Sequence, residues 1–511
     1  MNGDFKGDFT RDTFSSLNHY SRVLMQQGRV QLDADWNEQI DILLYYLRTL
    51  TRDLVGQRAV RGDGFLVAPY VSAQATTATR ARTRGARASR TDLASSTPDI
   101  SIARGHYYVD GILVENDSDF PYPFNIDDAQ RQKDPTLLVY LDVWERQVTY
   151  IENKYIREVA LGTLGPDTAT RGVVVRQVRT TSNMPDGKGG SVAIPNPPPP
   201  DVPKQSPDLH KQFIQNIDDN WLKTWIPMLE SPNRGSLKAK GREASKQDTT
   251  PCIISPESRY RGAENQLYRV EVHDGGAADG TATFKWSREN GAVVFPISKL
   301  AGKVVTLDTL GHDKRFGLKP DAWVEIVDDD YVLQDSPNPL LQIDTIDTVN
   351  MQVTLKDAPA TTVGQYQDKH PFLRRWDQHA GEHIDGSEVT LTEGAIVIQE
   401  SSEDTNWITL EDNVQIQFQA PAKTDPANTY RSGDYWLIPA RTITGDVEWP
   451  TDSKGDPLAQ GPHGVEHHYA PLALISLQNG KVDPKGVGVC DLRRKLITLW
   501  DGPAGCPAPT K

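Results

Sequence analysis

Two histidines and a glutamate have the H-x-x-E-H spacing in the run from His379 to His383. On a helix, this spacing places both imidazoles over a zinc ion and leaves the glutamate to act as a base. The run contains Gly381, however, and the turn-forming Ile384-Asp-Gly386 follows at once. Because the flanks predict β-structure, the sequence does not favour the helix that a metallopeptidase needs.

A second histidine-rich run joins Glu466, His467 and His468. Neighbouring residues of a strand point to opposite faces, so at most one of these histidines shares a site with Glu466. Imidazole and carboxylate suit zinc, but imidazoles that bridge loop carbonyls are the favoured alternative. We therefore predict no metal and no cofactor. The residues to examine for a metal are His467, Glu466, His379 and His383.

Two consecutive expected strands each end in a pair of residues that includes an acid. The pairs are His273-Asp274 and Arg288-Glu289. A cross-strand ion pair is the expected arrangement. The catalytic alternative pairs Glu289 or Asp274 with Glu271 for glycoside cleavage. The sequence has no G-x-S-x-G, Walker A or dinucleotide-binding motif, so we predict no catalytic residue.

One amphipathic helix is expected over 33–55. After Trp36, large apolar residues recur in steps of three and four, at positions 40, 43, 44, 47, 50 and 54. Asp35 and Glu38 have capping-box spacing, and Gly56 is a stop signal. The apolar stripe of this helix, expected to be the longest in the chain, must dock on the chain's own β-body or on another subunit.

The rest of the chain predicts β-structure, with short β-branched or aromatic runs between turn residues and an Asp110-Gly111 hairpin turn. The expected fold is mainly β, with several small β-sandwich or barrel-like domains, one N-terminal amphipathic helix and long irregular connectors. The expected ranges are an arm and helix over 1–65, a first β domain over 66–182, an insertion over 183–250, a second β domain over 251–365, and a third β domain with a C-terminal tail over 366–511.

Two segments between the strands have unusual composition. Residues 72–97 carry five arginines and few apolar residues, which is typical of a solvated basic loop or of a site for phosphate or an acidic partner. The insertion holds Pro197–Pro200 and a helical candidate over 213–225. In that candidate, Trp221 and Trp225 share one face and are suited to seal the insertion against the body or against a neighbour.

Composition excludes broad classes of function. With 55 Lys and Arg against 69 Asp and Glu, the net charge of −14 argues against a general nucleic-acid or anionic-membrane binder. No apolar run could span a membrane, and the start lacks a signal-peptide pattern. We expect synthesis in the cytoplasm, with an extracellular or particle-associated location after lysis. Cys252, Cys490 and Cys506 are expected to be reduced, with a Cys490–Cys506 pair as the alternative.

The run Met25-Gln-Gln-Gly-Arg-Val-Gln-Leu-Asp-Ala-Asp-Trp-Asn-Glu38 resembles the N-terminal signature of an uncharacterised bacterial family. Gly105–Glu115, Leu141–Tyr150, Phe284–Gly291 and Gly464–Tyr469 are similar to it as well. That family is associated with gene clusters for phage-tail-like contractile injection systems and with tail-fibre-like proteins. The resemblance implies partners within a particle and transfers no catalytic residue.

Two functions remain open. The first is a structural or adaptor subunit of a contractile tail-like particle, in its baseplate or distal tail, with homo-oligomers as an option. Its expected assembly contacts are Phe5, Phe9, Phe14, Trp36, Ile40, Leu43 and Leu47. On this view, removal of residues 2–16 leaves the body folded. The alternative is that this leader packs on the chain's own β-body.

The second function is glycan binding or cleavage on a tail-spike-like protein. Such a protein needs exposed aromatic rings in a groove beside paired acids. The candidate rings are Trp144, Trp376, Trp436 and Trp449. Burial of these rings in β-cores would remove the platform.

Overall fold

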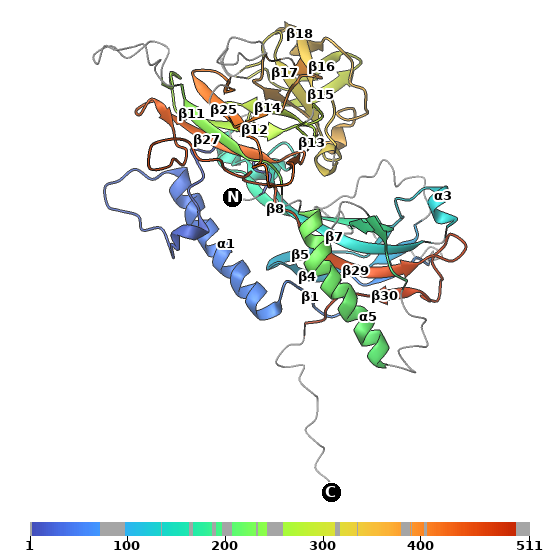
Figure 1. The fold of residues 1–511 in the computed structure, drawn as a ribbon. Coiled ribbons are helices and arrows are strands. Elements are labelled where there is room, and N and C mark those ends of the chain that lie inside the picture. The colour runs from blue at the N-terminus through green and yellow to red at the C-terminus, as the bar shows by residue number, and fades with distance from the viewer. Residues whose placement is uncertain are drawn as a thin grey trace. The chain divides into compact units, whose positions relative to one another are not determined.

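The protein is mainly β, with several sheets and few helices, as its sequence predicts (Figure 1). The computed structural model describes residues 3–71, 98–133, 135–162, 167–185, 191–196, 207–230, 233–242, 259–278, 280–311, 317–334, 336–379, 389, 391–402 and 406–496. The basic loop, the proline run, His383, Cys252 and Cys506 lie outside these residues. Within them, no helix is long and apolar enough to cross a membrane.

The chain forms two compact units, and each takes three segments of the sequence. Unit 1 comprises 1–42, 145–173 and 231–466, and unit 2 comprises 43–144, 174–230 and 467–511. The sequence-based domain ranges are consecutive along the chain, so they differ from these two units, each of which combines separate segments. The chain passes from one unit to the other within helix α1 (Asp33–Val55) and within strands β7 (Thr136–Val148) and β8 (Arg171–Thr181).

Helix α1 confirms the prediction drawn from its apolar spacing, and it is the longest helix of the described residues. It begins at Asp33, whose carboxylate accepts hydrogen bonds from the backbone N–H and the hydroxyl of Thr10. This start agrees with the expected range of 33–55. The helix ends where predicted, since Gly56 has φ +87° and its N–H donates to the carbonyl of Arg52 at 2.8 Å.

A β-sandwich forms part of unit 1. Its six-stranded sheet has the order β21 (Leu391–Thr392), β22 (Ala395–Val397), β14 (Thr283–Ser287), β12 (Gln266–Val272), β27 (Tyr435–Arg441) and β28 (Asp446–Val447). The facing sheet has the order β11 (Leu237–Gly241), β25 (Val414–Gln419) and β23 (Glu400–Ser401), with β24 (Ile408–Thr409) also on β25. Phe418 packs on Phe284 and Trp436 of the opposite sheet, so the two sheets share one core. A two-stranded sheet pairs β13 (Gly276–Ala277) with β26 (Thr429–Tyr430).

A closed antiparallel barrel completes the β-structure of unit 1. Its order is β15 (Val294–Ala301), β16 (Val304–Leu307), β19 (Gln352–Leu355), β18 (Leu341–Asp347), β17 (Trp323–Val327) and β20 (Phe372–Trp376). Alternate residues of these strands, including Phe295, Val305, Ile343 and Leu373, fill its interior. A smaller cluster of Leu340, Trp376 and Ala395 brings residues of the barrel region and the sandwich together.

Unit 2 contains three sheets around one core. The first sheet has the order β1 (Arg58–Val60), β4 (Gly105–Val109) and β5 (Ile112–Asn116). The second has the order β2 (Val67–Pro69), β3 (Ile100–Ile102) and β6 (Phe120–Tyr122). The third has the order β30 (Val489–Asp491), β29 (His468–Ser476), β7 and β8. A hairpin pairs β9 (Asn183–Pro185) with β10 (Ser191–Ala193). The Asp110-Gly111 turn is confirmed, because both residues have positive φ, as a type I′ turn requires.

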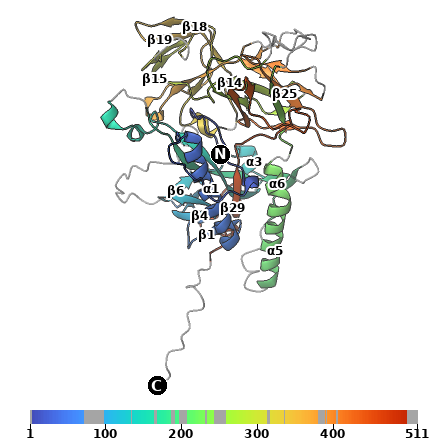
Figure 2. The same cartoon turned by 90° about the vertical axis from the view of Figure 1, so that its left-hand side faces the viewer.

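Strand β7 is buried on both faces, which explains its unbroken apolar run. Leu137 and Val139 face the core of the sheets, whereas Leu138 and Tyr140 face Trp221 and Trp225. These tryptophans lie in a π-helical turn η4 (Trp221–Trp225) between α5 (Pro207–Asn220) and α6 (Ile226–Leu229) (Figure 2). They pack the helices of the insertion onto the β-structure of unit 2, which is the first of the two arrangements expected from the sequence.

The remaining helical segments are single turns. They are α3 (Asp128–Arg131), η1 (Ser16–Asn18), η2 (Lys154–Ile156), η3 (Val159–Leu161), η5 (Tyr331–Leu333) and η6 (Gln367–Lys369).

Candidate functional sites

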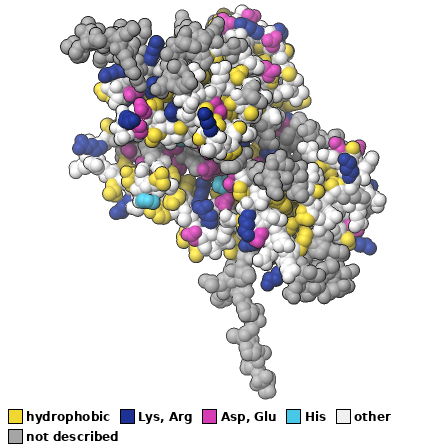
Figure 3. Space-filling model, in the orientation of Figure 1, with side chains coloured by type: hydrophobic (Ala, Val, Ile, Leu, Met, Phe, Trp, Pro, Cys, Tyr) yellow, Lys and Arg dark blue, Asp and Glu magenta, His cyan; other side chains and the backbone are white. Residues whose placement is uncertain are grey.

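An apolar surface covers the outside of α1 and the segment before it. More than half of the exposed large hydrophobic side chains of the described residues come from 17–54. We call this set the α1 surface: Leu17, Tyr20, Leu24, Met25, Val30, Leu32, Trp36, Ile40, Leu43, Leu44, Tyr45, Tyr46, Leu47, Leu50 and Leu54. Figure 3 shows hydrophobic side chains gathered over this helix, with charged ones between them. Concentrated apolar exposure of this kind marks an interaction surface.

The apolar stripe of α1 is exposed, whereas a helix that covers its own β-body buries its stripe. Glu38 accepts a hydrogen bond from the Thr13 hydroxyl, and Gln39 accepts one from the backbone N–H of Val23, both at 2.8 Å. Ala34 and Ile42 are the buried side chains of the helix. The preceding segment thus makes polar contacts to α1, and the apolar stripe of the helix is exposed.

The leader before α1 is built into unit 1. Asp4 lies beside Arg146 in a parallel bridge, and backbone hydrogen bonds join Asp4 to Glu145 and to Gln147. The Tyr435 hydroxyl donates to the carbonyl of Gly3 at 2.7 Å. Residues 3–7 thus form an additional extended segment on the body of the same unit.

The three leader phenylalanines, predicted as assembly contacts, are half-buried on their own chain. Phe5, Phe9 and Phe14 each have intermediate exposure, and the Phe5 ring lies against Gly172. The leader therefore follows the alternative in which it packs on its own β-body. Trp36, Ile40, Leu43 and Leu47, the other predicted contacts, are all exposed.

A buried charge cluster lies where the leader meets the six-stranded sheet. Glu271 accepts from Arg269 Nε at 2.6 Å and lies 3.2 Å from Lys6 Nζ and 3.4 Å from Lys285 Nζ. Burial opposes the ionisation of Glu271, but Lys6, Arg269 and Lys285 outweigh it and hold its pKa well below the usual range. Arg269 also donates to Asp4 at 3.0 Å. The leader therefore supplies both an anion and a cation to this cluster.

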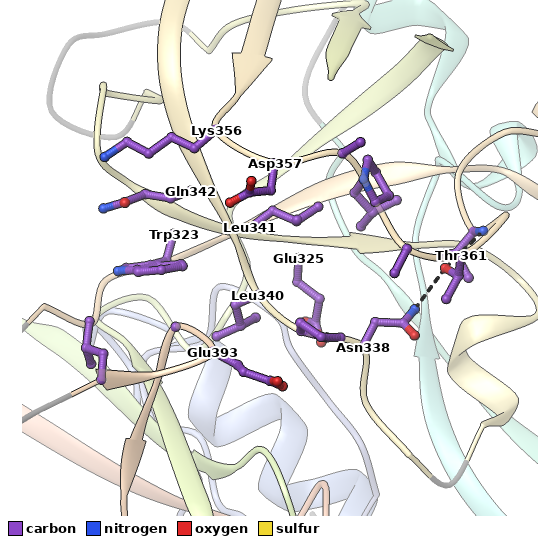
Figure 4. A pocket seen from close by; sticks show the side chains of 18 residues that line it. Trp323, Glu325, Asn338, Leu340, Leu341, Gln342, Lys356, Asp357, Thr361 and Glu393 are labelled. Atoms are coloured by element: carbon purple, nitrogen blue, oxygen red, sulfur yellow. Dashed lines mark hydrogen bonds between the residues drawn. The ribbon is translucent and has the colours of Figure 1, made fainter. Parts of the chain in front are cut away.

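A pocket of about 430 Å³ opens between the barrel and the β21–β22 turn (Figure 4). Trp323, Gln342 and Lys356 lie on one side of it, and Asn338 and Thr361 lie on the other, joined by a hydrogen bond of 3.4 Å. Gly394 packs directly on the Trp323 ring. A Cβ there would come within 2.6 Å of the indole, so only glycine fits. The volume is in the range of small-molecule sites.

Glu325 also lines this pocket, but its carboxylate is already fully engaged. It accepts from Lys285 at 2.8 Å, from the Tyr331 hydroxyl at 2.7 Å and from Trp376 Nε1 at 3.0 Å. Burial opposes its ionisation, and Lys285 and Arg374 outweigh burial and lower the pKa of Glu325 to about 2. Glu325 is therefore a permanent anion in a structural network and is unsuited to proton transfer near neutral pH.

A separate carboxylate cluster holds two groups that titrate near neutrality. Burial and the nearby charge of Asp377 raise the pKa of Glu289 to about 7. Burial also raises the pKa of Glu411 to about 7, although the positive charge of Arg288 acts to lower it. Glu289 accepts from Arg375 at 2.7 Å and Glu411 from Arg288 at 2.8 Å. The sequence singled out Arg288 and Glu289 but missed Asp377 and Glu411, which only the fold brings near them.

The glycosidase pair considered from the sequence is not supported by these contacts. Glu271 is bonded to cations of the buried charge cluster, whereas Glu289 is bonded to Arg375. Asp274 accepts from the hydroxyl of Thr283 at 3.1 Å instead of joining a second acid. Neither Glu289 nor Glu411 lines the pocket beside Trp323.

The histidines weighed as metal ligands have other partners. His467 Nδ1 lies 2.6 Å from Asp142 Oδ1, and its ring stacks on Trp144 at 4.9 Å. His379 is exposed and packs edge-on against Trp286, and Glu466 is also exposed. Across the described ranges, no three His, Cys, Asp or Glu residues are grouped to hold a metal ion. Cys490 is buried and free, and burial raises its pKa to about 11.

The tryptophans that a glycan platform needs are not exposed. Trp144, Trp376 and Trp436 are buried, and Trp449 is partly buried against the core of the sandwich. Trp323 lines the pocket, and Trp36 is exposed on α1. The described aromatic side chains therefore fill β-cores for the most part, as the sequence favours.

A family model matches residues 5–187 and 231–490, which together make up most of the chain. The matched ranges include most of the leader and all of α1, and the stretch between them falls within the insertion expected over 183–250. Neither a curated protein nor a solved structure matches this chain. By the extent of the match, the protein belongs to the family of unknown function DUF6519.

Proposed function

We propose that this protein is a structural or adaptor subunit of a multi-protein particle and that it joins the particle through the α1 surface. The single observation that carries this proposal is the outward apolar face of α1. The resemblance of residues 25–38 and of the later motifs suggests the kind of particle, a contractile phage-tail-like one, with the baseplate or distal tail as the position of the subunit.

The energetics of the α1 surface support a docking role. Fully burying one Leu, Ile or Trp side chain contributes about 1.5 to 3 kcal/mol. The stripe of α1 holds six such residues, at positions 36, 40, 43, 47, 50 and 54. Their combined burial can offset an association cost of about 4 to 15 kcal/mol.

The contacts of the described acids support a structural role over catalysis. Two buried carboxylates, Glu271 and Glu325, are paired with cations, which strongly lower the pKa values of both acids. The tryptophans expected for glycan binding fill cores, so we do not extend the proposal to glycans.

The test is a pair of matched double variants produced in the native host. We expect Leu43→Glu with Leu47→Glu to abolish co-sedimentation with the particle, because two charges on the stripe cannot be buried without a partner. The control is Val349→Glu with Ile443→Glu, which changes two apolar residues on turns of unit 1 that are 88% and 93% exposed and do not belong to the α1 surface. Both variants should keep the wild-type thermal transition. Normal incorporation of the α1 variant would contradict the proposal.

A further inference from the structure

The exposed stripe of α1 has the spacing of a coiled-coil seam. Trp36, Ile40, Leu43, Leu47, Leu50 and Leu54 follow one another in steps of four, three, four, three and four. Each of the six is between 42% and 77% exposed. A strict alternation of three and four has a period of 3.5 residues, which keeps a seam facing one neighbouring helix along its whole length. The occupant of this face is therefore a helix.

We infer that this helix is α1 of a second copy of the chain, paired antiparallel as a two-fold symmetric dimer. The inference rests on the proposed function and names the partner at the same surface. The seam is symmetric about position 45, so antiparallel pairing places Trp36 beside Leu54 of the second copy. It likewise places Ile40 beside Leu50 and Leu43 beside Leu47 of that copy. Each seam residue then meets another large apolar residue.

The charges of α1 permit self-pairing and select its direction. Of the residues that flank the seam, at positions 37, 39, 44, 46, 51 and 53, only Asp53 is charged. The antiparallel register places Asp53 beside Gln39 of the second copy, on the same side of the seam, so no like charges face each other there. The first half of α1 carries four acids and no base, and its second half carries Arg48, Arg52 and Asp53. Antiparallel pairing sets the acidic half beside the more basic half and also opposes the two helix dipoles.

The seam is wide enough for a stable contact. Leu44 and Tyr46 flank it on the two sides and are themselves exposed. At about 1.5 Å per residue, the 23 residues of α1 span about 34 Å, or about three heptads. An apolar face of this width and length is the kind that drives helix association.

The experiment uses the purified full-length protein. Sedimentation at tens of micromolar should show a dimer for the wild type, and dimerisation at least tenfold weaker for Leu43→Glu with Leu47→Glu. The Val349→Glu and Ile443→Glu control should dimerise normally. A wild-type protein that stays monomeric would overturn the inference. If the α1 variant also fails to enter the particle, the proposed function survives with a different protein as the occupant. A dimer that persists in the α1 variant would also overturn the inference, because its interface would lie elsewhere.

Disulfide trapping tests the direction of pairing. A mixture of Ile40→Cys and Leu50→Cys proteins should form a covalent dimer under mild oxidation, whereas Ile40→Cys alone should not. Two copies of position 40 lie about 15 Å apart along an antiparallel pair, and a disulfide needs Cα atoms within about 7 Å. The wild type, oxidised in the same way, controls for the native cysteines. Strong cross-linking of Ile40→Cys with itself would show parallel pairing and refute the antiparallel arrangement.

Discussion

Replacing Glu271 with Gln should lower the free energy of unfolding of unit 1 by about 3 to 5 kcal/mol, the usual result of removing one partner from a buried ion pair. The variant keeps the shape of the side chain but leaves Lys6, Arg269 and Lys285 without their shared carboxylate. Chemical denaturation followed by tryptophan fluorescence measures the change. The control is Asp357→Asn, at an 88% exposed side chain, which should change stability by less than about 0.5 kcal/mol.

The acid side of the stability profile gives a second readout of the same variant. Glu271 and Glu325 have lowered pKa values in the folded protein, so their contribution is present above the unfolded value of 4.5 and is lost as the pH falls through their folded pKa values. The Glu271→Gln variant should therefore lose less stability than the wild type as the pH falls from 4.5 towards 2. Two results would contradict the stabilising role of Glu271. One is an equal loss of stability in the variant and the wild type as the pH falls, and the other is an unchanged free energy of unfolding at neutral pH.

Deletion of residues 3–11 should destabilise unit 1 by at least about 3 kcal/mol or prevent it from folding. The deletion removes the leader carbonyls that accept from Arg269, Asn290 and Tyr435, each of which is buried. It also removes Asp4 and Lys6 from the buried charge cluster. Unsatisfied buried donors and unpaired buried charges are among the most expensive defects in a folded protein.

The thermal transition measures this effect, with Asp8→Asn as the control because Asp8 is an exposed residue of the same leader. This expected result is the opposite of the sequence-based expectation that removal of residues 2–16 leaves the body folded. A deletion variant with the wild-type transition temperature would show that the leader contacts contribute little and would restore that expectation.

The sequence predicts α1 well because periodicity and end signals are local properties. Steps of three and four identify the residues that share a face, and Gly56 marks the end. The predicted start at 33 agrees as well, although the contact between Asp33 and Thr10, which is 23 residues away, leaves no local signal. Nor can periodicity tell whether a stripe points inward or outward, since that depends on which distant segments supply the polar contacts of the helix.

The buried charge cluster could not be predicted from its strand. In β12, charged Arg269 and Glu271 alternate with apolar Tyr268, Val270 and Val272, a pattern typical of a sheet with one solvated face. All seven residues of β12 are buried nonetheless. The leader covers the charged face, and a pairing between residues 4 to 7 and residues 269 to 290 leaves no local signal in the sequence.

The neutral-pH carboxylates show the same limit. Arg288 and Glu289 were singled out because they end a strand, and a cross-strand pair was expected. Their partners, Glu411 and Arg375, lie about 90 to 120 residues further along the chain. In contrast, the sequence predicts the Asp110-Gly111 turn, because a tight turn depends on residues that are adjacent in sequence.

Radical footprinting of the α1 surface tests the central claim most directly. Trp36 and Tyr46 should react strongly in the Leu43→Glu and Leu47→Glu variant, where α1 has no partner, and should be protected in wild-type protein taken from the particle. Tyr155 and Tyr366, which are 66% and 47% exposed away from α1, should react equally in both. If Trp36 and Tyr46 react as strongly in the particle as in the variant, the α1 surface is not the contact through which this protein assembles.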